Sequence, residues 1–164
     1  MSGGLRQHLN AKIKYLEILA FGHPLAGLQL VKGTIELGKL PTQAALRELR
    51  EEAGIQASVI CHLCNQKNAA TGQLWHFYGC HASKVLPDQW QFFTQDDGGY
   101  WFEFFWHPLV INRSQQTDWL ANESKTVLKD WHSMFQQALQ FLQQRLTAIS
   151  SDELDRILSS IRHC

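Results

Sequence analysis

The sequence lacks several features that would mark particular classes of protein. Its 15 Lys and Arg balance 15 Asp and Glu, so no broad basic surface predicts binding to duplex nucleic acid. No apolar run approaches the roughly 20 residues of a membrane-spanning helix, and the first 15 residues hold no signal-peptide core. We therefore expect a cytoplasmic protein that binds neither duplex nucleic acid nor membrane.

Cysteine is also scarce, with four residues scattered over 164, too few for a disulfide-stapled secreted domain. Cys61 and Cys64 do form a C-x-x-C around His62, but the second ligand pair of a zinc site is missing. Residues three apart in a β-strand point to opposite faces. We interpret both cysteines as buried small side chains, with a zinc or redox role for the pair as the alternative.

Runs with β character recur along a chain whose length suits one domain. The segment "QKNAATGQ" predicts a hairpin turn, because Asn68 and Gly72 can take positive φ. The strands joined by this turn should be antiparallel neighbours in a mixed sheet. We predict strands over residues 13–21, 28–31, 58–64, 74–81 and 100–106.

Two segments read as helices. The first opens at Pro41 with Thr42 as its N-cap and ends at Gly54. The second covers residues 123–148, and its apolar residues recur at helical spacing: Val127, Leu128, Trp131, Met134, Phe135, Ala138, Leu139 and Leu142. These elements predict an α+β fold, an α/β/α sandwich with a mixed β-sheet between helices.

We divide the chain into a domain of residues 1–148 and a helical tail of residues 149–164. Ser150 and Glu153 are spaced as a capping box at the start of the tail. Its apolar face would pack either on the same domain or on a partner subunit in a homodimer.

Acidic residues gather at the C-terminal end of the first helix, where the helix dipole disfavours negative charge. Residues three and four apart share a helix face, so Glu48 lies beside both Glu51 and Glu52. A divalent cation such as Mg²⁺ or Mn²⁺ would compensate three carboxylates. In the alternative, Arg47 and Arg50 neutralise them through i,i+3 and i,i+4 ion pairs.

The spacing within residues 33–55 resembles the Nudix box, G-x5-E-x7-R-E-U-x-E-E-x-G-U, where U is aliphatic. This is the signature of enzymes that hydrolyse nucleoside diphosphates linked to another group. Eight of its nine specified positions agree: Gly33, Arg47, Glu48, Leu49, Glu51, Glu52, Gly54 and Ile55.

The resemblance implies a catalytic metal site and a phosphoanhydride bond as the target. Glu48 and Glu52 would be the principal Mg²⁺ or Mn²⁺ ligands, and Glu51 a further ligand or the carboxylate that orients the attacking water. The main-chain carbonyl of Lys32 would complete the metal shell. A monophosphate, or pyrophosphate from a nucleoside triphosphate, would be among the products.

Lys39 departs from the family, which has glutamate at this position to pair with the box arginine. By resemblance, Arg47 holds the loop before the helix, and Gly33 lets the loop backbone approach a phosphate. Our preferred hypothesis is that Glu36 pairs with Arg47 instead while Lys39 faces solvent. Alternatively, Lys39 contacts a substrate phosphate. A catalytically impaired nucleotide-binding module is the second functional hypothesis.

Family members often recruit a further carboxylate after the box, as metal ligand or general base. The spacing does not choose among four candidates: Glu103, Asp96, Asp97 and Glu123. Aromatic residues on the predicted strands either pack in the core or stack on a substrate base: Trp75, Phe77, Trp101 and Trp106. The sequence leaves the identity of the nucleotide substrate open.

Overall fold

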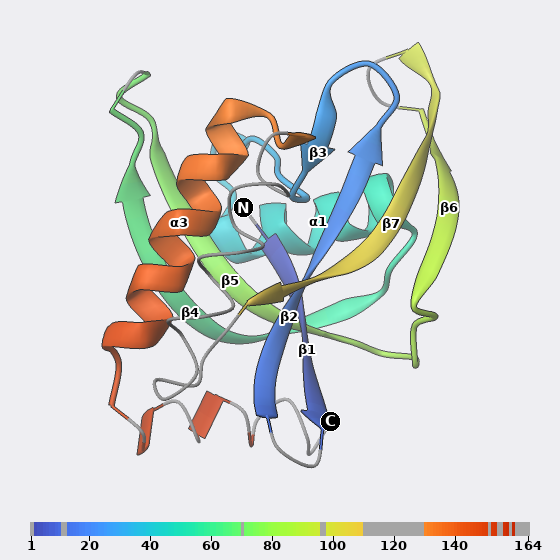
Figure 1. The fold of residues 1–164 in the computed structure, drawn as a ribbon. Coiled ribbons are helices and arrows are strands. Elements are labelled where there is room, and N and C mark those ends of the chain that lie inside the picture. The colour runs from blue at the N-terminus through green and yellow to red at the C-terminus, as the bar shows by residue number, and fades with distance from the viewer. Residues whose placement is uncertain are drawn as a thin grey trace.

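A mixed β-sheet with a helix on each side forms the fold (Figure 1). This computed structural model describes residues 2–10, 13–69, 71–95, 98–109, 130–150, 152–153, 156–157 and 159. The two helices are α1 (Pro41–Ala53) and α3 (Ser133–Ala148). The strands are β1 (Ser2–Asn10), β2 (Ile13–His23), β3 (Gly27–Gln29), β4 (Ala57–Lys67), β5 (Leu74–Ala82), β6 (Gln89–Thr94) and β7 (Tyr100–Leu109).

The strands pair in the order β4-β5-β1-β2-β7-β6, and β3 pairs separately with β2. β1 runs parallel to β5, whereas the other pairings between these named strands are antiparallel. The predicted mixed sheet is therefore confirmed. The five predicted strands are all present with shifted ends, whereas β1 and β6 were not predicted.

Side chains of β2 alternate between two separate cores. Leu16 and Ile18 pack with α3 on one face of the sheet, and Leu19 and Phe21 pack with α1 on the other. Figure 1 shows α3 in front of the sheet and α1 behind it. This alternation is the period of two that a strand buried on both faces requires. The structure thus confirms the predicted α+β sandwich.

Helix α1 ends where the sequence predicts and begins with a different cap. Gly54 has φ 68° and donates its N–H to the carbonyl of Arg50, which ends the helix in the left-handed conformation. The predicted N-cap Thr42 is wrong. Leu40 occupies the cap position, because Pro41 takes the first helical position and the Gln43 side chain accepts the Leu40 N–H at 2.9 Å.

Helix α3 begins at Ser133, ten residues after the predicted start. Trp131 was predicted on the helix and instead forms a parallel β-bridge with Leu28. The His132 imidazole accepts the Met134 N–H and caps the helix. Residues 123–129 lie outside the described part of the chain. The later apolar stripe is buried as predicted: Phe135, Ala138, Leu139 and Leu142.

The β4–β5 hairpin has the predicted antiparallel pairing and turn. Gly72 has φ 72°, as expected for its position. Asn68 contributes through its side chain, whose Oδ1 accepts the Thr71 N–H at 3.0 Å. The hairpin brings residues 73–76 to the edge of the candidate site.

Part of the tail contacts the α3 side of the domain. The Glu153 N–H donates to Ser150 Oγ at 3.2 Å, half of the predicted capping box. Ile157 packs against the α3 core, and Arg145 forms an ion pair with Glu153 at 3.7 Å. Among the described helices, none has the length and apolarity needed to cross a membrane.

Both cores should be needed for stability. Leu49→Ala on the α1 side and Leu139→Ala on the α3 side should each lower the free energy of unfolding by about 2–5 kcal/mol, because each leaves a cavity in a fully packed region. Urea unfolding measures this loss. Leu37→Ala is the control, since Leu37 is fully exposed, and should change stability by less than about 0.5 kcal/mol. Either core variant matching this control would contradict the two-core assignment.

Candidate functional site

Glu48 lies against the loop that precedes α1. A Cβ placed on Gly33 would overlap the Glu48 carboxyl group, so a larger residue here would displace the Glu48 side chain. The Glu48 side chain is otherwise enclosed, and the residue is 7% exposed. In this structure the group against Gly33 is therefore a carboxylate of the same chain, and the approach of a phosphate to Gly33 stays a prediction.

Arg47 joins this carboxylate to the loop. Its guanidinium forms ion pairs with Glu36 and Glu48 and donates to the Thr34 carbonyl at 3.1 Å. Its Nε also lies 3.3 Å from a carboxylate oxygen of Glu51. The hydrogen bond to Glu48 is the main cause that raises the pKa of Arg47. Arg47 holds the loop as the family resemblance implies.

The Arg47–Glu36 ion pair confirms the preferred hypothesis for the departure at Lys39. Lys39 is exposed, and its main-chain N–H donates to the Glu36 carbonyl at 3.0 Å, which closes the turn before α1. Glu36 supplies the carboxylate that the family places at position 39. The loop therefore stays attached to the helix despite the reversed charge at Lys39.

The chemistry of the donors suits Mg²⁺ or Mn²⁺, since Glu48, Glu51 and Glu52 offer hard carboxylate oxygens within two helical turns. The positions of these side chains fit a metal site less well than their chemistry does. Within the described ranges, no three His, Cys, Asp or Glu residues come together closely enough to hold a metal ion. Arg47 forms ion pairs with Glu48 and Glu51, and the pair with Glu51 has the i,i+4 spacing that the alternative predicted. Glu52 is half-buried on the same helix.

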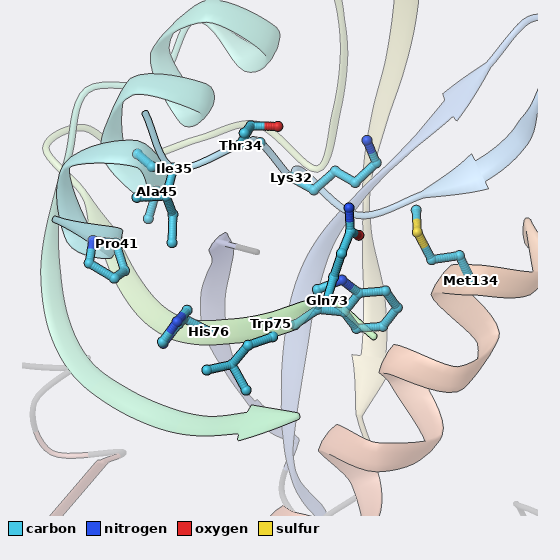
Figure 2. Close-up of a pocket in the computed structure, with 12 residues that line it drawn as sticks. Lys32, Thr34, Ile35, Pro41, Ala45, Gln73, Trp75, His76 and Met134 are labelled. Atoms are coloured by element: carbon cyan, nitrogen blue, oxygen red, sulfur yellow. The ribbon is translucent and has the colours of Figure 1, made fainter. Parts of the chain in front are cut away.

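A pocket of about 400 Å³ opens next to the loop. Figure 2 shows its walls, which come from the loop, the start of α1, the start of β5 and the start of α3. Two of the predicted site residues, Lys32 and Gly33, line it, and Lys39 does not. The lining residues are Lys32, Gly33, Thr34, Ile35, Pro41, Ala44, Ala45, Gln73, Leu74, Trp75, His76 and Met134.

Most of the pocket could not be found from the sequence. Trp75 was considered for base stacking, and it is both 8% exposed in the α3 core and part of the pocket wall. Gln73 and His76 follow the predicted hairpin, but their polarity alone is ordinary for a turn. Nothing local in the sequence places Met134 near Lys32, because the sheet pairing brings them together.

Of the four candidates for a late carboxylate, only Glu103 falls within the described residues; Asp96, Asp97 and Glu123 lie outside them. Its neighbours Phe102 and Phe104 pack in the α1 core, so Glu103 points to the other face of the sheet. There it accepts a hydrogen bond from Gln91 Nε2 at 3.0 Å. This placement separates Glu103 from the glutamates of α1.

The C-x-x-C pair is divided by irregular strand pairing. Register shifts separate Val59 from Cys61 and His62 from Cys64. Cys64 belongs to the α3 core, and burial raises the pKa of its thiol to about 11. Cys61 is half-buried and its thiol pKa is also raised by burial. The interpretation as a buried side chain fits Cys64, whereas Cys61 is only half-buried, and among described residues no third metal ligand joins the pair.

The Glu36–Arg47 pair can be measured directly with a double-mutant cycle. Glu36→Gln and Arg47→Gln should show a coupling free energy of about 0.5–1 kcal/mol, because the pair is partly exposed. Stability is read from urea unfolding of both single variants and the double variant. Lys39→Gln replaces Glu36→Gln in the matched control cycle, where the favourable coupling should vanish. Equal coupling in the two cycles would contradict the substitution of Glu36 for the family's glutamate.

A comparison with known proteins bears on this arrangement. A sequence profile of the NUDIX domain matches residues 15–110, more than half of the chain. The match spans β2 to β7 and includes the loop, α1 and the glutamates. No curated protein matches the sequence. This match agrees with the glycine in the loop, with the contacts of Arg47 to the loop and with the glutamates of α1. The chain belongs to the Nudix hydrolase family.

Proposed function

We propose that this protein is a metal-dependent hydrolase that splits a phosphoanhydride bond in a nucleoside diphosphate-linked or nucleoside polyphosphate substrate. Family membership supports a hydrolase acting on pyrophosphate bonds in general. The observation that carries the finer proposal is the Glu48 carboxylate at Gly33, on a loop that also lines a pocket. Acidic ligands and a substrate-sized space thus meet at one loop.

Glu48, Glu51 and Glu52, with the main-chain carbonyl of Lys32, would hold Mg²⁺ or Mn²⁺. When bound, such an ion neutralises phosphate charge and lowers the pKa of a bound water. Arg47 acts as a positioning residue, because it fixes both the loop and the Glu48 side chain. Lys32 lines the pocket without an ion pair to another described residue, and we assign its ammonium group to a substrate phosphate.

Glu52→Gln tests the proposal. The protein should release phosphate-containing products from at least one of four substrate groups, namely nucleotide sugars, ADP-ribose, dinucleoside polyphosphates and nucleoside triphosphates, only with Mg²⁺ or Mn²⁺. The variant should lose about two orders of magnitude in kcat, since a bound metal supplies several kcal/mol and each 1.4 kcal/mol is a factor of ten.

Asp152→Asn is the control, because Asp152 is an exposed carboxylate in the tail. It should keep full activity. Unfolding midpoints of both variants separate a loss of chemistry from a loss of fold. Equal turnover in Glu52→Gln and the parent protein would remove Glu52 from the metal site.

The second candidate is a nucleotide-binding module without turnover. It is favoured by one observation, that Arg47 engages both Glu48 and Glu51 and no metal-holding cluster is assembled among the described residues. Under this candidate, nucleotides bind but no member of the substrate panel gives a metal-dependent product. Product release from any member of the panel excludes it.

Glu103 should be dispensable for hydrolysis. Glu103→Gln is expected to retain at least half of kcat, because Glu103 faces away from α1 and already accepts a hydrogen bond from Gln91. The measurement is the full pH profile of kcat with the best substrate of the panel. A tenfold or larger loss, or a missing limb of the profile, would restore Glu103 as the late base.

A further inference from the structure

The pocket beside the loop carries little charge. Among its lining residues only Lys32 and His76 can be positively charged, and none is acidic. Burial lowers the pKa of His76, which favours its neutral imidazole. Figure 2 shows His76 well apart from Lys32 and Met134. The pocket therefore offers one cation, at the loop, and otherwise neutral walls.

Gln73 contributes a polar side chain to this pocket. Its carbonyl accepts the Asn68 N–H at 2.8 Å, and its N–H donates to Thr71 Oγ1 at 3.4 Å, so the hairpin turn fixes its backbone. Its side-chain amide hydrogen-bonds no other described residue. The turn therefore fixes the backbone of Gln73, while its amide can hydrogen-bond a ligand.

Apolar side chains line the pocket next to this exposed amide. Trp75 follows Gln73 by two residues on β5, meets Phe77 edge-on with ring centroids 6.4 Å apart, and is held in the α3 core. Met134 lies in the opposing wall from α3. A volume of about 400 Å³ falls within the roughly 300–1,000 Å³ of small-molecule pockets.

We propose that Gln73 is the specificity-determining residue of this pocket, and that its amide hydrogen-bonds the edge of an uncharged heteroaromatic base while Trp75 and Met134 pack against the ring. An amide presents a donor and an acceptor together, the pattern found on base edges. This inference rests on the proposed function, because it places the phosphates of the same substrate at Lys32.

The charge of the pocket also defines what it rejects. A substrate with a further phosphate on the pocket side would meet neutral walls and a single ammonium group. Glu48, on the loop side of Gly33, would add repulsion. The pocket favours a neutral base over an additional anionic group, and the hydrogen bond to that base comes from Gln73.

Equilibrium binding without metal tests this independently of hydrolysis. Isothermal titration calorimetry would compare adenosine, guanosine, cytidine and uridine 5′-monophosphates with ribose 5-phosphate. The tightest nucleotide should bind about tenfold more tightly than ribose 5-phosphate. Gln73→Leu should weaken that nucleotide about tenfold and leave ribose 5-phosphate unchanged. Gln140→Leu, an exposed glutamine of α3 outside the pocket, is the matched control and should bind like the parent protein.

Two results would overturn the inference. One is ribose 5-phosphate binding as tightly as every nucleotide, and the other is Gln73→Leu binding like Gln140→Leu. Failure of the proposed function gives a different pattern, in which nucleotides bind through Gln73 and no substrate is hydrolysed. Thermal unfolding of both glutamine variants verifies that each is folded.

Discussion

The guanidinium group of Arg47 is the contact on which the candidate site depends. It leaves α1 and reaches Glu36 and the Thr34 carbonyl in the preceding loop, and it also contacts the buried Glu48 carboxylate. A single planar cation with five donors can make all these contacts, which an ammonium group could not. The loop, the helix and the acidic side chain consequently share one position in space, and Gly33 is the residue small enough to allow it.

The pocket depends on a second junction, between β3 and the start of α3. Trp131 forms a β-bridge with Leu28, and the His132 N–H donates to the Leu28 carbonyl at 3.1 Å. Gly27 lies so close to the Asp130 carbonyl that a Cβ would overlap it. Because this junction fixes where α3 begins, it also fixes Met134 in the pocket wall. The pocket is thus built by the sheet and both helices together.

Local patterns predicted much of the fold and the contact that holds the loop to α1. Glycine spacing predicted the end of α1, and the family resemblance implied that Arg47 holds the loop. The pairing of Glu36 with Arg47 followed from the charge at Lys39. The start of α3 was missed, because the bridge between Trp131 and Leu28 is long-range and leaves the helical spacing of apolar residues unchanged.

The missed strand β1 has the polar sequence "SGGLRQHLN", and only its neighbours make it a strand. It is inserted between β5 and β2, with Ser2 opposite Tyr78. The earliest strand of the chain can therefore complete its pairing only after residues some 75 positions later have left the ribosome. During synthesis one edge of this central strand therefore stays unpaired until β5 has emerged.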